Sequence, residues 1–102
     1  MFDENHQMLF MQLVMQNQQV AMISLGKVKN PVSDRFEKNL EYAKLSIDTL
    51  DMLSQKTKGN LSEYEEKLLT ETVSQLKITY VEESGKETSA ERKLNNEKQS
   101  KE

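Results

Sequence analysis

The chain has 102 residues, of which 35% are hydrophobic and 30% are charged, and its formal net charge is −3. A chain of this length forms one domain with a small core, and its acidic balance argues against binding to the phosphate backbone of a nucleic acid. The absence of cysteine excludes disulfides and zinc–thiolate sites and fits a reducing compartment.

Glycine and proline divide the chain into three segments with helical periodicity. Gly26 and the sequence KNP, which ends at Pro31, make the first break, and Gly59 with Asn60 makes the second. The segments predict helices over residues 3–25, over residues 33–57 with Ser33 as the N-cap, and over residues 62–83. Because the connections are short, consecutive helices should be antiparallel neighbours. The sequence therefore predicts an all-α fold, a three-helix antiparallel bundle.

The bundle domain is predicted to cover residues 1–83, and residues 84–102 are predicted to form a disordered polar tail. The tail has one large apolar residue, Leu94, and so it has too little apolar surface to hold a packed structure. The opening sequence MFDENHQ carries acids where an export signal has lysine or arginine, and Gln12 with the run QNQQ interrupts the longest apolar stretch. We therefore expect a cytoplasmic protein that neither spans a membrane nor binds one.

The first predicted helix carries two apolar stripes. One stripe consists of Phe10, Leu13, Val14 and Ala21, and the other of Met8, Met11, Met15 and Met22. A surface helix of a monomer needs only one such stripe, so we predict that the methionine stripe is the interface of a homodimer. The alternative is a monomer in which this helix lies centrally and the methionines fill the core.

The second and third predicted helices each carry one apolar seam. The seam of the second helix consists of Phe36, Leu40, Ala43, Ile47 and Leu50, and that of the third of Leu69, Val73, Leu76 and Tyr80. Their spacing approximates the 3.5-residue repeat of helices that pack side by side. The rest of the third helix is polar, so it offers no second apolar face to cover the methionine stripe.

The sequence KTKGN, residues 56–60, has two interpretations. A nucleotide-binding loop needs several glycines between a strand and a helix, whereas this segment has one glycine and follows a helix. A structural interpretation explains the residues as a helix–turn–helix corner, in which Gly59 ends one helix and Ser62 with Glu65 forms a capping box for the next. The candidate contact site at this corner consists of Lys56, Lys58 and Asn60.

No catalytic or metal-binding set is found in the sequence. His6 is the single histidine and stands near the N-terminus. Asp48 and Asp51 lie on neighbouring turns, but Lys44 is four residues before Asp48 and can pair with it on an exposed helix face. Because no histidine or cysteine completes an acid–base or metal set, we expect no enzymatic activity, no cofactor and no metal.

The sequences SLGKVKNP, LEYAKLSIDTLDMLSQKTKGNLSEYEEKLL and VSQLKITYV together resemble a bacterial family known as domain of unknown function 1844. The resemblance covers about residues 2–83. The resemblance implies a short, all-helical cytoplasmic protein and assigns no activity to it. Family members share KTKGN rather than a glycine alone, which supports the corner as a contact site. Lys77 stands where the family has arginine, so the resemblance assigns no guanidinium role to this position.

We interpret the sequence as that of a homo-oligomeric helical bundle, most simply a dimer, which acts as an interaction or adaptor protein and can bind a protein partner. The first alternative is a regulatory anion- or nucleotide-binding protein that uses the KTKGN corner. The second alternative, a nucleic-acid accessory protein, is disfavoured by the acidic composition.

Overall fold

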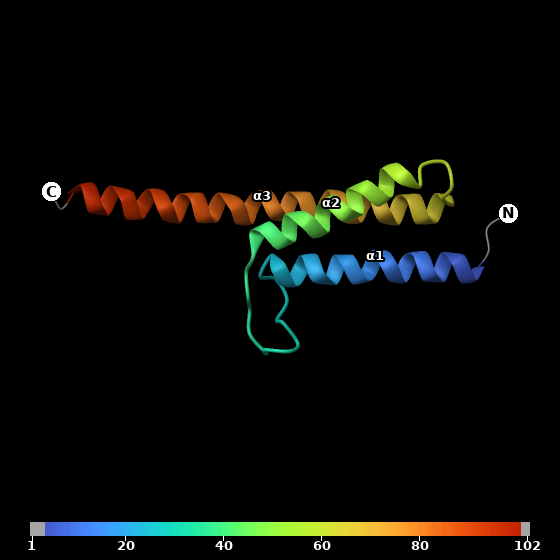
Figure 1. The fold of residues 1–102 in the computed structure, drawn as a ribbon. Coiled ribbons are helices and arrows are strands. Elements are labelled where there is room, and N and C mark those ends of the chain that lie inside the picture. Colours follow the sequence, from blue (N-terminus) through green and yellow to red (C-terminus); the bar gives the residue numbers. More distant parts are fainter. Residues whose placement is uncertain (1–3, 101–102) are drawn as a thin grey trace.

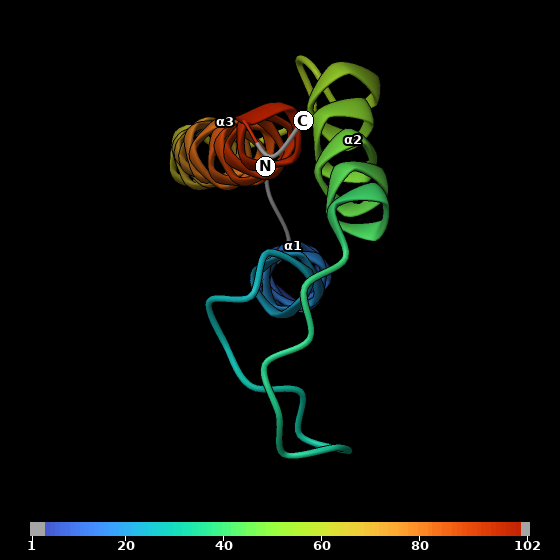
Figure 2. The same ribbon diagram turned by 90° about the vertical axis from the view of Figure 1, so that its left-hand side faces the viewer.

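A computed structural model describes the backbone of residues 4–100 and the side chains of residues 4–87. It contains three α-helices: α1 (Glu4–Ser24), α2 (Leu40–Lys56) and α3 (Glu63–Ser100). Helix α2 runs antiparallel to both of the others, and the three axes form a triangle in cross-section (Figures 1 and 2). The predicted three-helix bundle is confirmed. Within residues 4–100, no helix combines the length and apolar content that a membrane span requires.

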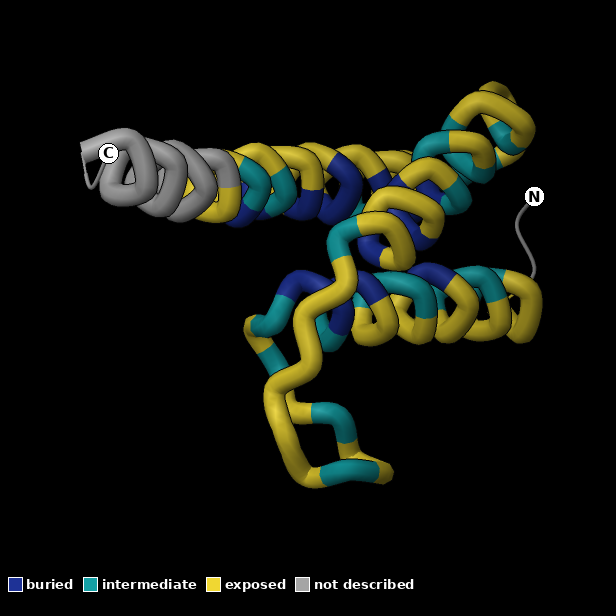
Figure 3. The backbone as a smooth tube through the Cα atoms, turned by 60° about the vertical axis from the view of Figure 1, so that its left-hand side comes forward, coloured by how far each residue is buried: buried dark blue, intermediate teal, exposed yellow. Residues whose placement is uncertain are grey.

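The core lies where the three helices face one another (Figure 3). Nine buried apolar residues form it: Val14, Ala21, Leu25, Ala43, Ile47, Leu50, Leu69, Val73 and Leu76. Most of the predicted seams are therefore confirmed, with Phe10, Leu40 and Tyr80 packed at the edge. Two assignments are wrong, because Leu13 is exposed on the outside of α1 and Phe36 is exposed in the segment before α2.

Helix α1 ends in two hydrogen bonds around Gly26. The Lys27 N–H donates to the Met22 carbonyl oxygen, and the Gly26 N–H donates to the Ile23 carbonyl oxygen, both at 3.0 Å. This Schellman arrangement needs a residue in the left-handed region, and Gly26 has a φ of +78°. The predicted break at Gly26 is confirmed.

The α1–α2 loop, residues 25–39, is organised by Asn30. The Asn30 N–H donates to the Arg35 carbonyl oxygen at 2.8 Å, and the Asn30 carbonyl oxygen accepts from the Asp34 N–H at 2.8 Å. The Asn30 side chain accepts from the Val32 N–H at 2.9 Å and donates to Glu37 Oε2 at 3.1 Å. These bonds form a closed turn, and Asp34 within it has a φ of +57°.

The predicted start of the second helix at Ser33 is wrong, because this turn occupies the segment. Helix α2 begins at Leu40, and Asn39 caps it by accepting a hydrogen bond from the Tyr42 N–H at 3.0 Å. The Asn39 N–H also donates to the Ser24 carbonyl oxygen at 2.8 Å, which attaches the start of α2 to the end of α1.

The corner between α2 and α3 has the predicted chemistry. Gly59 has a φ of +87° and lies two residues after the C-cap Thr57, one position later than a standard C′ glycine. The Ser62 N–H donates to Glu65 Oε1 at 2.8 Å, and the Glu65 N–H donates to Ser62 Oγ at 3.2 Å. These reciprocal bonds confirm the capping box, and α3 begins at the next residue, Glu63.

Helix α3 continues to Ser100, so its predicted end near Glu83 is wrong. Gly85 lies inside the helix without a left-handed φ, and one interior glycine costs a helix only about 1 kcal/mol. The predicted disordered tail, residues 84–102, is not confirmed, because the backbone is helical from residue 84 to residue 100. Residues 101–102, like the side chains from residue 88 onward, lie outside the described part of the chain.

Candidate functional site

One side of α1 is directed away from the other two helices. Eight exposed side chains form this outer face of α1: Met8, Leu9, Gln12, Leu13, Met15, Gln16, Gln19 and Val20. With about 100° of rotation per residue, the glutamines occupy the middle of the face and the apolar side chains occupy its two edges. The edges differ in composition, since one consists of methionines and the other of leucines and a valine.

The predicted methionine interface is divided by the structure. Met8 and Met15 are 60% and 56% exposed and form one edge of the outer face of α1. Met11 is partly buried, and Met22 packs against the core. The other two helices therefore leave two of the four predicted residues uncovered, and they partly cover the remaining two.

The outer face of α1 is uncharged. Residues 7–26 contain no aspartate, glutamate, lysine or arginine, although 30% of the whole chain is charged. By contrast, the exposed positions of α2 and of α3 up to residue 87 include Glu41, Lys44, Glu71, Lys77 and Glu82. Charge is depleted in the centres of protein interfaces because it is costly to remove from water. The outer face of α1 therefore shares this low charge with the centres of protein interfaces.

The α1–α2 loop projects beyond α1 on the side away from α2 and α3 (Figures 1 and 2). It presents two apolar side chains to solvent, Val32, which is 94% exposed, and Phe36, which is 60% exposed. The Lys29 ammonium lies 5.8 Å from the centre of the Phe36 ring, and this cation–π contact helps to orient the ring. An open pocket of about 470 Å³ separates the loop from the helices, with Val20, Lys38 and Tyr42 among its lining residues.

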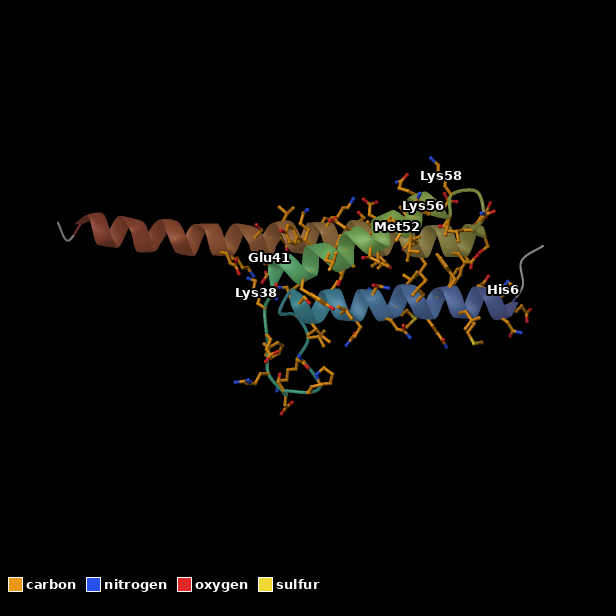
Figure 4. All side chains as sticks on the ribbon, in the orientation of Figure 1. His6, Lys38, Glu41, Met52, Lys56 and Lys58 are labelled. Carbon is orange, nitrogen blue, oxygen red and sulfur yellow. The ribbon has the colours of Figure 1, made fainter. Side chains whose placement is uncertain are left out.

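The corner residues Lys56, Lys58 and Asn60 do not converge on one point. All three are exposed, and Figure 4 places both lysines on the outer side of the end of α2. Only Lys58 lines the small pocket at the corner, of about 130 Å³, and Glu66 lines it as well. A carboxylate in this position opposes the binding of an anion, so the geometry favours the structural interpretation of KTKGN.

A cluster of charged groups lies at the opposite end of the bundle, where Figure 4 labels Lys38. Its centre is Glu83, whose side chain is only 9% exposed. Lys86 Nζ lies 2.8 Å and Lys27 Nζ lies 3.3 Å from Glu83 Oε2, and Lys38 Nζ lies 3.2 Å from Oε1. Lys27 and Lys38 belong to the α1–α2 loop, so this cluster attaches the loop to α3.

The lysines make the Glu83 carboxyl group strongly acidic. The hydrogen bond from Lys86 is the largest cause, and together with Lys38 and Lys27 it lowers the pKa of Glu83 from 4.5 to about 2, against the opposing effect of burial. The same hydrogen bond raises the pKa of Lys86. Because each lysine is paired with this carboxylate, the cluster acts as a structural connection between loop and helix.

The other candidate groups for chemistry have ordinary structural positions. Lys44 lies 3.5 Å from Asp48, as predicted, and Lys77 lies 3.2 Å from Asp51, linking α3 to α2. His6 is exposed near the start of α1 (Figure 4). Among the described residues, no group of three or more histidine, cysteine or acidic side chains is arranged to hold a metal ion.

Sequence reasoning missed two residues of the outer face of α1 and the charged cluster around Glu83. Leu9 and Val20 belong to the outer face of α1, but neither falls in the two stripes predicted for this helix. The signal that could have identified them is the absence of charge between His6 and Lys27. The cluster around Glu83 joins residues far apart in the sequence, and no local pattern marks it.

The chain was compared with protein families, with curated proteins and with solved structures. Residues 7–82, well over half of the chain, match the model of the family described as Domain of unknown function (DUF1844). No curated protein and no solved structure matches the chain. The matched range includes nearly all of α1, the α1–α2 loop, α2 and the core-forming part of α3. The chain therefore belongs to the DUF1844 family.

Proposed function

We propose that this chain is a homo-oligomeric interaction or adaptor protein, which acts by binding and not by catalysis, with α1 as its main contact helix. The observation that supports this proposal is the exposure of large apolar side chains along the uncharged outer face of α1. Leu9, Met8 and Met15 expose more than half of their surface to solvent. Several large apolar side chains exposed on one uncharged helix face are typical of binding surfaces.

The energetics of α1 favour association. Burying one methionine or leucine side chain is worth about 1.5–3 kcal/mol in transfer free energy. Several such side chains, each matched by its counterpart in a second copy, can offset an association cost of roughly 4–15 kcal/mol. Methionine also adapts to different neighbouring shapes, so the same face could accept a protein partner in an adaptor role.

Sedimentation equilibrium of the full chain at tens of micromolar tests this proposal. The wild type should sediment as a dimer, and the double variant Met8→Glu with Met15→Glu should sediment as a helical monomer. Both residues are exposed, and glutamate is a good helix former, so the fold should be retained. A matched control is Ile78→Glu with Val81→Glu, which changes two exposed apolar residues of α3 and should leave the dimer intact.

Two results would contradict the proposal. One is a wild type that remains monomeric at tens of micromolar. The other is a methionine double variant that unfolds, as measured by circular dichroism, because this would assign the methionines to the core of a single chain.

A further inference from the structure

We infer, resting on the proposed function, that the partner of the outer face of α1 is the same face of a second copy. In this arrangement the two α1 helices pack antiparallel across a two-fold axis, with Gln12 and Gln16 near the axis. The α1–α2 loop of each copy extends over the beginning of the other copy's α1. Four observations on the described residues support this inference.

The first observation is the absence of charge. In a two-fold contact the same patch meets itself, so every charge near the axis would meet a like charge. The outer face of α1 avoids this problem, since residues 7–26 have no acidic or basic side chain. A partner that binds through charged side chains would need side chains of opposite charge on the outer face of α1, and this face has none.

The second observation is the presence of glutamines in the middle of the face. A side-chain amide has both donors and acceptors, so glutamine can bond to glutamine in a contact between identical surfaces. Gln12, Gln16 and Gln19 are all exposed and lie between the two apolar edges. The face is therefore complementary to itself in polar groups as well as in apolar ones.

The third observation is the position of the α1–α2 loop. The loop projects past α1 at its C-terminal end, on the side that a second α1 would occupy (Figures 1 and 2). In an antiparallel pair the two loops lie at opposite ends, and Val32 and Phe36 of each can cover the partner helix. In a parallel pair both loops would project into the same end of the contact. The loop therefore favours the antiparallel arrangement.

The fourth observation is the available area. The five apolar residues and three glutamines of the face are all exposed, and the loop adds Val32 and Phe36, which are 94% and 60% exposed. Each partner in a standard interface buries about 800 Å², so a stable dimer needs an extended surface of this kind. The exposed Leu45 and Met52 of α2 form a smaller patch beside the charged pair Lys44 and Asp48, which makes them weaker candidates.

The test uses substitutions that keep side-chain shape. The double variant Gln12→Glu with Gln16→Glu adds two negative charges per chain close to the proposed axis. Its control, Gln55→Glu with Asn60→Asp, adds the same charge at exposed positions of the α2–α3 corner. Sedimentation should show that the first variant raises the dimer dissociation constant by on the order of tenfold or more, while the control changes it little.

A mixing experiment separates an interface effect from misfolding. The variant Gln12→Lys with Gln16→Lys should also be monomeric by itself. When it is mixed with the Gln12→Glu and Gln16→Glu variant, opposite charges meet across the axis, and a heterodimer should form.

The possible results are distinguishable. A wild-type dimer that the variant at Gln12 and Gln16 leaves intact would overturn this inference but not the proposed function. Equal weakening of the dimer by the test and control variants would also overturn this inference. Failure of the glutamate and lysine variants to form a heterodimer would overturn it as well. A monomeric wild type would overturn the proposed function itself.

Discussion

Lys38 and Glu83 are 45 residues apart in the sequence, yet Lys38 Nζ lies 3.2 Å from Glu83 Oε1 and 3.4 Å from the Glu83 carbonyl oxygen. Lys38 immediately precedes Asn39, the N-cap of α2, and Glu83 lies within α3. Lys27, just after α1, meets the same carboxylate. One glutamate thus connects the end of α1, the start of α2 and the middle of α3.

The first prediction concerns the pH dependence of stability. The pKa of Glu83 is about 2 in the folded chain and near its ordinary value of 4.5 in the unfolded chain. Between these values the unfolded chain binds a proton that the folded chain does not, so the stabilisation is complete above about pH 4.5 and is lost as the pH falls toward 2. Thermal unfolding of the wild type between pH 2 and 6 should reveal this loss.

The variant Glu83→Gln should have a lower melting temperature at pH 6 and a weaker dependence on pH below 4.5. Glu71→Gln, at an exposed position of the same helix, serves as the control and should keep the wild-type pH profile. If the melting temperature of Glu83→Gln fell with pH in parallel with that of the wild type, the lysines would not be holding this carboxylate in its charged form.

The second prediction compares the same substitution at two glycines. Gly59→Ala should destabilise the chain by about 1 kcal/mol, because alanine is strained at a φ of +87° although no atom lies within 4 Å of the added methyl group. Gly85→Ala should stabilise it by about 0.5–1 kcal/mol, because Gly85 lies in a helix with open space around it. Urea unfolding measures both changes, and equal effects at the two positions would contradict the geometry of the corner or of α3.

The third prediction concerns the C-terminal boundary of the packed domain. A chain that ends after Glu83 lacks Lys86, whose ammonium lies 2.8 Å from the Glu83 carboxylate, and Glu87, which lies 3.9 Å from Lys38. It should therefore melt at a lower temperature than a chain that ends after Glu87. The chain that ends after Glu87 should melt close to the full-length chain, and a fall of several degrees would show that later residues contribute to packing.

The fourth prediction concerns the α1–α2 loop. Asn30→Ala removes two side-chain hydrogen bonds, to Glu37 and from the Val32 N–H, and should make the backbone amides of residues 30 and 32–35 exchange faster with solvent. It should also weaken dimerisation, since the loop is proposed to cover the partner helix. Val28→Ala is a control outside these hydrogen bonds. Unchanged rates of amide hydrogen exchange in Asn30→Ala would mean that the turn does not depend on this side chain.

Local sequence patterns were sufficient to predict much of the fold. The repeat of Ala43, Ile47 and Leu50 identified the buried side of α2, and the pairing of Ser62 with Glu65 identified the start of α3. Both features depend on residues within two turns of each other. The helical periods and the capping box of α3 were therefore readable from the sequence alone.

The errors arose where two local preferences compete or where distant residues meet. Ser33 and Asn39 are both suitable N-caps, and the hydrogen bonds of Asn30 exclude a helix at Ser33. Met22 was assigned to an interface because its stripe is regular, but the end of α1 lies deep enough in the bundle to bring Met22 against the core. The cluster around Glu83 could not be predicted, because its lysines come from separate parts of the chain.

Chemical crosslinking through a single introduced cysteine tests the proposed self-association through α1 most directly. The chain has no cysteine of its own, so Gln16→Cys places one thiol near the proposed axis, and Ser74→Cys places one at an exposed position of α3. With a short bismaleimide at micromolar protein concentration, Gln16→Cys should form covalent dimers much faster than Ser74→Cys. Equal rates for the two variants would contradict the account, because they would show that α1 meets a second copy no more often than α3 does.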